Sequence, residues 1–291
     1  MSSFGLTAFC TDQSADPASV AAAAEAAGFG TLWFPDHTHV PVSRRSPYPG
    51  GGELPEHYKR TYDPLVAGAF AAAATTTLVV GIGVCLVPAR DPIVLAKQVA
   101  SLDVLAGGRF ALGVGAGWNA EEVEDHGVVA AERWTVLDER VRAMQTIWSQ
   151  DEASFSGRHV SFDPMWSWPK PLPRAGRNWP PIVVGGHGDA VLRRVVAIGD
   201  EWLAMAAPGR PPLRERMAEL RRLADTAGRA TPRVSVQVYG DPPDPRVIEK
   251  YLTLGVDRID LTAPHAAPGA MLDAIARLGR AMGPWMAGRT A

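Results

Sequence analysis

The stretch that decides the fold is Gly107–Asn119, which reads GGRFALGVGAGWN. Its apolar run Phe110–Val114 is typical of a buried strand, and it leads through Gly115 and Gly117 to Asn119, a good helix N-cap. Glycines at the carboxyl end of a strand let the backbone approach a ligand closely. The stretch therefore predicts a strand–loop–helix unit with a ligand site in its loop.

The same unit recurs along the chain. Most of its strands are continuous apolar runs, as in parallel strands that are covered on both faces. The predicted strands are Phe4–Phe9, Thr31–Phe34, Leu78–Val87, Phe110–Val114, Ile182–Val184, Glu201–Met205, Val234–Tyr239 and Arg258–Leu261. The predicted helices are Pro17–Ala27, Asp63–Ala74, Pro92–Leu105, Asn119–Asp125, Ala131–Trp148, Gly188–Ile198, Pro211–Ala227, Pro245–Leu254 and Gly269–Met282.

Strands that alternate with helices in this number predict an α/β fold, a (β/α)8 TIM barrel that forms a single domain over residues 1–291. A doubly wound sheet is the alternative, but the chain shows no place where the strand order reverses. Two long irregular segments, at about 38–62 and 149–181, interrupt the alternation, and we expect them to be inserted lids. Trp166 and Trp168 of the second segment would either cover the substrate or form a small core of their own.

The composition narrows the function classes. A formal net charge of −2 gives no attraction to nucleic acid or to an anionic membrane. Cys10 and Cys85 lie in apolar segments, so we expect buried thiols in a reducing cytoplasm. The longest apolar run, Leu78–Ala89, is too short to span a bilayer, and the first residues do not resemble a signal peptide. The P-loop, zinc-protease and Cys-x-x-Cys patterns are absent, and no metal ligand set is predicted.

In such barrels the site forms where the strands end. Asp36 and His37 directly follow the second predicted strand. His37 is a candidate general acid or base because an imidazole titrates near neutral pH, and Asp36 would orient a ring or a ligand. The alternative is that Asp36 caps a turn and His37 packs beneath the lid.

The third and fourth predicted strands end in further candidates. Glycines inside a strand indicate a bulge, so Gly83 and Val84 would lie under a flat ligand or pack tightly against a neighbouring strand. Gly115 would bring the backbone close to a ligand. Asn119 carries a donor and an acceptor, which suit a ring edge or a ribityl hydroxyl, although a simple N-cap is the alternative.

The fifth predicted strand runs into Gly185, Gly186 and His187 just before a helix. Backbone N–H groups at a helix N-terminus favour a phosphate, and a glycine turn without a ligand is the alternative. His265 follows the last strand, where it would line the site or lie in a surface loop.

Several segments carry a family resemblance. They are AAGFGTLWFPDH at Ala26–His37, GIGV at Gly81–Val84, PIVLAKQ at Pro92–Gln98, LDVLAGGRFALGVGAGWN at Leu102–Asn119 and PIVVGG at Pro181–Gly186. In these segments the chain resembles the luciferase-like monooxygenase superfamily and, more narrowly, its bacterial deazaflavin-dependent oxidoreductases, which use coenzyme F420. The resemblance covers most of Phe4–Leu203.

The resemblance implies a flavin or deazaflavin ring in the barrel mouth. Asp36 and His37 would lie beside the ring, and Gly83–Val84 would form a bulge with a non-proline cis peptide. Gly185 and Gly186 would donate to the cofactor phosphate. The predicted catalytic residue is His37, and the predicted cofactor-binding residues are Asp36, His37, Gly83, Val84, Gly115, Asn119, Gly185, Gly186 and His187.

The implied activity is hydride transfer between F420 and a small organic substrate in a homodimer, and a separate cofactor reductase is a candidate partner. One alternative is an FMN-dependent monooxygenase that uses reduced flavin and dioxygen, and another is a non-catalytic flavin-binding barrel. Some family members that oxidise sugar phosphates carry a glutamate where this chain has Ala116. That departure disfavours a sugar phosphate as the substrate.

Overall fold

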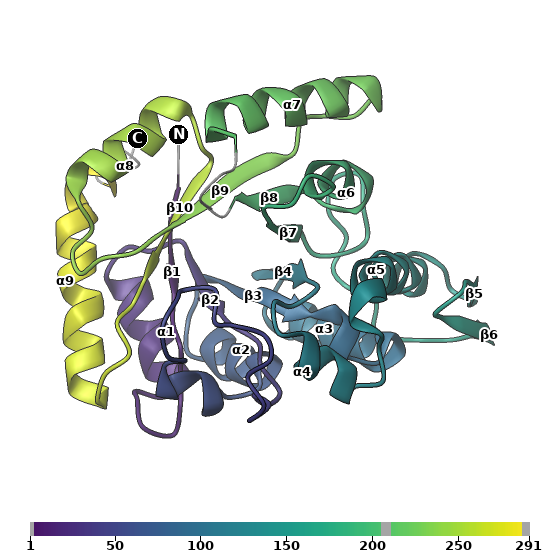
Figure 1. Cartoon of the computed structure of the whole chain (residues 1–291), viewed down its shortest axis with the longest axis horizontal. Helices are drawn as coiled ribbons and strands as arrows, with labels where there is room; N and C mark the ends of the chain where they lie inside the picture. Colours follow the sequence, from purple (N-terminus) through teal and green to yellow (C-terminus); the bar gives the residue numbers. More distant parts are fainter. Residues whose placement is uncertain (1–2, 205–210, 287–291) are drawn as a thin grey trace.

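The computed structural model describes residues 3–204 and 211–286. Eight parallel strands close into one barrel in the order β1-β10-β9-β8-β7-β4-β3-β2, with helices around it (Figure 1). The barrel strands are β1 (Ser3–Thr7), β2 (Thr31–Phe34), β3 (Val79–Leu86), β4 (Phe110–Gly115), β7 (Ile182–Gly186), β8 (Glu201–Ala204), β9 (Arg233–Val238) and β10 (Arg258–Thr262). The predicted (β/α)8 barrel is confirmed, and the doubly wound alternative is wrong because that sheet would be open.

The predicted strands agree with these bounds to within two residues at most ends. The prediction Phe4–Phe9 runs two residues beyond the end of β1 at Thr7. The predicted end of the sixth strand, Met205, lies outside the described residues.

Four helices begin at an aspartate followed by a proline, as the sequence predicted for the first and third. Asp16, Asp63, Asp91 and Asp244 each accept backbone N–H groups of the following turn. The helices are α1 (Pro17–Ala26), α2 (Pro64–Ala73), α3 (Pro92–Leu105), α4 (Ala120–Asp125), α5 (Arg133–Ser149), α6 (Val191–Ile198), α7 (Leu213–Thr226), α8 (Pro245–Leu254) and α9 (Pro268–Met286). Relative to prediction, α6 begins three residues later and α9 ends four residues later.

The inside of the barrel holds charges as well as apolar side chains. Arg258 Nε donates to Asp260 Oδ1 at 2.8 Å, and Arg258 Nη2 lies 2.6 Å from Glu201 Oε1. Trp33 Nε1 donates to the same Asp260 oxygen at 3.1 Å. Burial raises the pKa of Asp260, and the arginine opposes that shift. These charges are tolerated inside because they are paired with one another.

The two long segments lie at opposite ends of the barrel. Residues 38–62 connect the end of β2 to α2 and include the 3-10 turn Glu56–Lys59, so they lie at the mouth, where the strands end. Residues 149–181 connect α5 to the start of β7. They contain an antiparallel hairpin, β5 (Ala153–Ser156) and β6 (Ser161–Met165), which the sequence analysis did not predict and which extends from α5 at the edge of the molecule (Figure 1).

The prediction that Trp166 and Trp168 cover the substrate is therefore wrong. A connection from a helix to the next strand arrives at the end where the strands begin. The contacts of this segment agree, since Arg174 Nη2 donates to the Gly108 carbonyl just before β4. Both tryptophans are also solvent-exposed, at 76% and 58%, so they form no small core of their own either.

Two smaller expectations concern the thiols and the membrane. Cys10 and Cys85 are both free and buried, as predicted. Across the described part of the chain, the helices lack the combination of length and apolar character that a membrane crossing requires.

Because Trp33 fills the barrel interior beside Gly81, we expect that a larger side chain at this position destabilises the protein. A Cβ at this position would lie 2.3 Å from two ring atoms of Trp33, whereas a Cβ at Gly188 would meet nothing within 4 Å. We expect Gly81→Ala to lower the free energy of unfolding by about 1–3 kcal/mol, the usual cost of overpacking. Urea unfolding of both variants measures this, with Gly188→Ala as the control, and equal midpoints for the two variants would contradict it.

Candidate active site

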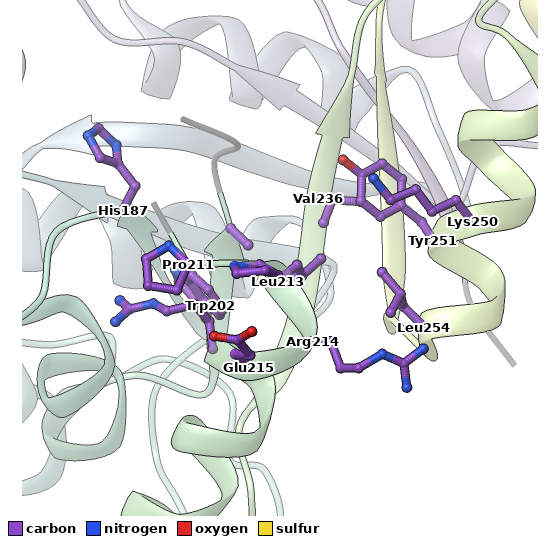
Figure 2. Close-up of a pocket in the computed structure, with 13 residues that line it drawn as sticks. His187, Trp202, Pro211, Leu213, Arg214, Glu215, Val236, Lys250, Tyr251 and Leu254 are labelled. Atoms are coloured by element: carbon purple, nitrogen blue, oxygen red, sulfur yellow. The ribbon is translucent and has the colours of Figure 1, made fainter. Parts of the chain in front are cut away.

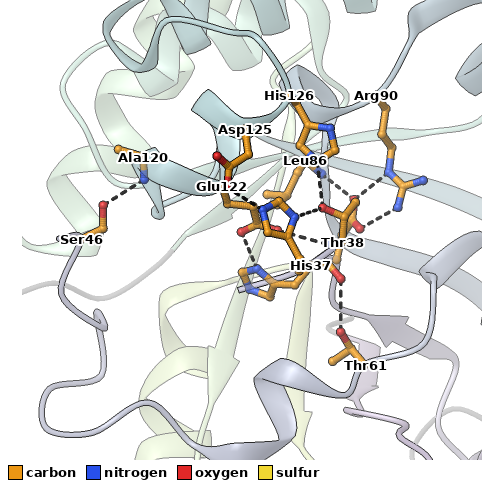
Figure 3. Close-up of polar contacts among 12 residues, drawn as sticks. His37, Thr38, Ser46, Thr61, Leu86, Arg90, Ala120, Glu122, Asp125 and His126 are labelled. Atoms are coloured by element: carbon orange, nitrogen blue, oxygen red, sulfur yellow. Dashed lines mark hydrogen bonds and ion pairs between the residues drawn. The ribbon is translucent and has the colours of Figure 1, made fainter. Parts of the chain in front are cut away.

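Asp36 lies just beyond the end of β2 and is buried. Its Oδ2 accepts the Leu86 N–H and Arg90 Nε, each at 2.9 Å, and its Oδ1 accepts Arg90 Nη2 at 2.7 Å (Figure 3). Burial opposes the charge of Arg90, but the bonds to Asp36 raise its pKa above the ordinary value. Both carboxylate oxygens are engaged in joining the end of β2 to the end of β3, so these contacts give Asp36 a positioning role.

His37 is also buried, with 7% of its side chain exposed. Its Nδ1 lies 2.8 Å from Glu122 Oε2, and Glu122 Oε1 accepts the Thr38 N–H at 3.1 Å (Figure 3). A carboxylate only accepts, so Nδ1 carries the proton of a neutral ring and the lone pair lies on Nε2. Within residues 3–204 and 211–286 no hydrogen bond engages Nε2. The pair is therefore arranged for proton transfer at Nε2.

Aromatic side chains surround the His37 ring. Tyr58, from the 3-10 turn of segment 38–62, has its ring centroid 5.4 Å away, and Trp118 lies edge-on at 6.0 Å. Phe9 packs against Tyr58 at 4.8 Å. Burial raises the pKa of the Tyr58 phenol, which therefore stays neutral. Tyr58 of segment 38–62, together with Phe9 and Trp118, thus forms an uncharged aromatic wall beside His37.

Two further histidines complete this wall. The rings of His57 and His265 stack with centroids 4.9 Å apart, and His265 Nε2 lies 3.0 Å from Thr11 Oγ1. Burial and the neighbouring His265 lower the pKa of His57 to about 4, and burial lowers that of His265 as well. His265 lies at the mouth, and near neutral pH neither ring adds a positive charge there.

The predicted bulge in β3 is confirmed. The register with β4 shifts between Ile82 and Cys85, and the Gly83–Val84 peptide is cis, as the family resemblance implied. The Val84 side chain lies over two of the predicted glycines. A Cβ at Gly115 would lie 2.5 Å from Val84 Cγ2, and one at Gly185 would lie 2.9 Å from Val84 Cγ1. Both glycines therefore make room for the bulge.

Asn119 is the N-cap residue of α4 but does not cap it with its side chain. The side chain is buried, and among the described residues neither Oδ1 nor Nδ2 has a hydrogen-bond partner. The Ala120 N–H instead donates to Ser46 Oγ at 3.0 Å. A buried amide of this kind normally has a partner, so it is suited to meet polar groups of a ligand.

The end of β7 presents Gly186 and His187. The Gly186 carbonyl accepts Trp202 Nε1 at 2.9 Å, so this strand end is tied to β8. His187 is the one predicted site residue that lines a cavity of about 460 Å³ between α7 and α8, with Trp202 and Val236 from the neighbouring strands (Figure 2). That cavity lies on the outer side of β8 and β9, away from His37.

The structure brings the predicted residues to one end of the barrel but does not test their roles. The sequence analysis missed Glu122 as the partner of His37, although an acidic residue in the first turn of α4 was a usable signal. It also missed Tyr58 and Trp118. An aromatic residue next to the glycine loop was a usable signal for Trp118, whereas nothing near Tyr58 in the sequence marks it.

Residues 11–282 match the luciferase-like monooxygenase family. The chain belongs to this family. Uncharacterized protein Rv0953c of Mycobacterium tuberculosis is 40% identical to it over 204 residues, which are 69% of this chain and 71% of that protein. The prediction of a luciferase-like oxidoreductase is thereby confirmed at the level of the family.

Solved structures share the luciferase-like fold at low sequence identity. An F420-dependent secondary alcohol dehydrogenase, in complex with an F420–acetone adduct, aligns with a TM-score of 0.73 and 16% identity over 95% of this chain and 98% of that one. The oxygenating constituent of 3,6-diketocamphane monooxygenase from Pseudomonas putida, in complex with FMN, aligns with a TM-score of 0.72 and 15% identity. The alignment covers 97% of this chain and 98% of that one. These two proteins hold different cofactors, so the shared fold does not decide between F420 and FMN.

The luciferase-like barrel holds segment 38–62 through Glu121. Burial would raise the pKa of Glu121, but hydrogen bonds from Ser46 and Ser43 lower it to about 2. A carboxyl whose pKa is lower in the folded than in the unfolded protein contributes stability above its ordinary pKa of 4.5. That contribution is lost as the pH falls towards 2.

We therefore expect Glu121→Gln to lower the free energy of unfolding at pH 7 by about 1–3 kcal/mol, since hydrogen bonds to a charged group are lost. The difference from the parent should shrink as the pH falls from 4.5 to 2. Urea unfolding at several pH values measures this. Glu124→Gln is the control on the same helix, because the partner of the Glu124 side chain among the described residues is exposed Arg45 and the pair should matter little. A pH-independent effect of Glu121→Gln would refute the assignment.

Proposed function

We propose that this chain is an F420-dependent oxidoreductase that moves a hydride between the deazaflavin and a small organic substrate at the barrel mouth. The observation that carries the proposal is the buried His37–Glu122 pair at 2.8 Å, placed where β2 ends. Oxidation of an alcohol or reduction of a ketone moves a hydride at carbon and a proton at oxygen. His37 Nε2 would exchange that proton, and Glu122 would orient the ring and stabilise the imidazolium.

The residues at the mouth suit a flavin-like cofactor, which when bound would supply the hydride chemistry. The unpartnered Asn119 amide would contact the ring or the ribityl chain, and the Val84 bulge would support the ring. The backbone at Gly185 and Gly186, followed by His187, would lie towards the phosphate. Gly115 would keep the mouth open beside Val84.

FMN with dioxygen is the second candidate, supported by the FMN-bound relative in fold. We favour F420 because a histidine fixed by a carboxylate serves proton transfer coupled to hydride transfer. For ketone reduction or for oxygenation, a separate reductase would supply the reduced cofactor. A non-catalytic barrel would need no such pair. The buried free thiols agree with a reducing cytoplasm as the site of the reaction.

The first experiment titrates the apoprotein with F420 and, separately, with FMN, following cofactor fluorescence. We expect tight binding of F420. Reduction of a panel of ketones is then followed by the absorbance of reduced F420. His37→Gln should still bind F420 and lose about 100- to 10,000-fold in rate at saturating cofactor, the usual contribution of a general acid or base.

Tight binding of FMN alone would replace this proposal with the monooxygenase. Binding of neither cofactor would remove the roles of Asn119, Gly185 and Gly186 together. A His37→Gln variant as fast as the parent would remove the catalytic role of His37 and favour a passive barrel.

We further propose a homodimer formed through α2 and α3, which lie side by side (Figure 1). Val66 and Phe70 of α2 and Val94 of α3 are 56%, 62% and 55% exposed. Exposed apolar side chains on neighbouring helices are typical of an interaction surface.

Phe70→Glu should convert the dimer to a monomer, because it places a charge in the apolar interface while the side chain is already outside the core. Light scattering measures the mass. Val129→Glu, at a 61% exposed valine elsewhere, is the matched control and should leave the dimer intact. A monomeric parent would overturn the proposed assembly.

A further inference from the structure

The part of segment 38–62 around residues 43–46 is fixed against α4 by one carboxylate. Ser43 Oγ donates to Glu121 Oε1 at 2.9 Å, and the Ser46 N–H donates to Oε2 at 3.0 Å. Ser46 Oγ donates to Oε2 as well. Glu121 therefore holds the chain on both sides of Arg44 and Arg45, and it sets the direction in which each arginine leaves the backbone.

The two neighbouring arginines have different surroundings. Arg45 is 67% exposed, and its Nη2 pairs with Glu124 at 2.8 Å. Arg44 has a left-handed backbone, with φ 53°, and its guanidinium lies over the Trp118 ring at 5.6 Å. Glu121 Oε1 forms an ion pair with Arg45 Nε, at 3.9 Å, rather than with Arg44. Among the described residues, Arg44 therefore lies over Trp118 without a carboxylate as its partner.

One end of the Arg44 guanidinium is buried and unpaired. Nη2 has a long contact of 3.4 Å to the Ser46 carbonyl, and Nη1 has no hydrogen-bond partner among the described residues. The next residue after Trp118 is Asn119, whose buried amide is unpartnered in the same part of the chain. A buried cationic donor and a buried amide without partners are rare in folded proteins unless a ligand meets them.

This cation lies close to the candidate catalytic histidine. Trp118, which the Arg44 guanidinium covers, has its ring 6.0 Å from the ring of His37. The rings of Tyr58 and Trp118 beside His37 are uncharged, and the charged neighbour of His37 is the Glu122 carboxylate, which is already paired with it. An anionic group beside Trp118 would therefore find Arg44 as its partner.

We propose that Arg44, assisted by Asn119, forms a subsite for an oxyanion, a carboxylate or a phosphate, beside the His37 centre. The inference rests on the proposed site at the mouth but not on the identity of its cofactor. The oxyanion would belong either to the substrate, as a carboxylate, or to the cofactor, whose phosphate would then lie here instead of at Gly185 and Gly186. A planar guanidinium suits both because it can donate two parallel hydrogen bonds.

The test is calorimetric titration of the apoprotein with sodium benzoate and with inorganic phosphate. We expect Arg44→Gln to bind the preferred ion about 10- to 100-fold more weakly, the usual worth of a hydrogen bond to a charged group. Arg44→Lys, which keeps the charge, should fall between. Arg45→Gln removes the neighbouring charge and should bind like the parent. Equal affinities for Arg44→Gln and Arg45→Gln, or a parent that binds neither ion, would overturn the subsite.

A second titration separates the two sources of the oxyanion. If the cofactor phosphate occupies the subsite, Arg44→Gln should weaken FMN but not riboflavin, which lacks the phosphate. If a substrate carboxylate occupies it, FMN and F420 should bind the variant as they bind the parent, and benzoate should still bind in their presence. Because the ion titrations use apoprotein, a failure of this subsite is distinguishable from a failure of the proposed cofactor or activity.

Discussion

The candidate site depends on two consecutive carboxylates on the short helix α4. Glu122 fixes the imidazole of His37 and the backbone of Thr38, whereas Glu121 fixes Ser43 and Ser46. Segment 38–62 has little regular structure of its own, so these buried acceptors replace the hydrogen bonds that a helix or strand would supply. The same two residues therefore determine the orientation of the catalytic candidate and the position of the wall that covers it.

The mouth is open enough for a bulge only because the neighbouring strands have glycines. A Cβ at Gly113 would lie 2.2 Å from the Ile82 carbonyl, and Gly115 and Gly185 leave space for Val84. Deeper in the barrel than Val84, Trp33 and the Arg258–Asp260 pair fill the interior. A ligand from the mouth therefore meets Val84 before it meets the charged interior, which separates the candidate chemistry from the buried charges that stabilise the barrel.

Much of the fold could be predicted from sequence because parallel strands buried on both faces appear as apolar runs, and because aspartate–proline pairs mark helix starts such as Asp16–Pro17 and Asp91–Pro92. His37 could be predicted because it lies just beyond a strand, and Asn119 because it stands between a glycine loop and a helix. The partner of His37 could not be predicted in the same way, since Glu122 is 85 residues away and the two meet only because β2, β3 and β4 lie side by side in the sheet. The position of Trp166 and Trp168 was missed for another reason. The length of segment 149–181 is typical of a lid, but a connection from a helix to the next strand arrives at the end of the barrel opposite the mouth.

The electrostatics of the mouth restrict the substrate beyond the choice of cofactor. The rings of Tyr58, Trp118 and Phe9 are uncharged, and burial keeps His57 and His265 neutral near pH 7. A ligand that is charged throughout would lose its hydration there without compensation. Arg44 is the one described cation shown to lie over this wall, stacked on Trp118. If Arg44 forms the proposed subsite, the site would favour a molecule with an apolar or aromatic body and a single anionic end, because each part would then meet a surface of matching polarity.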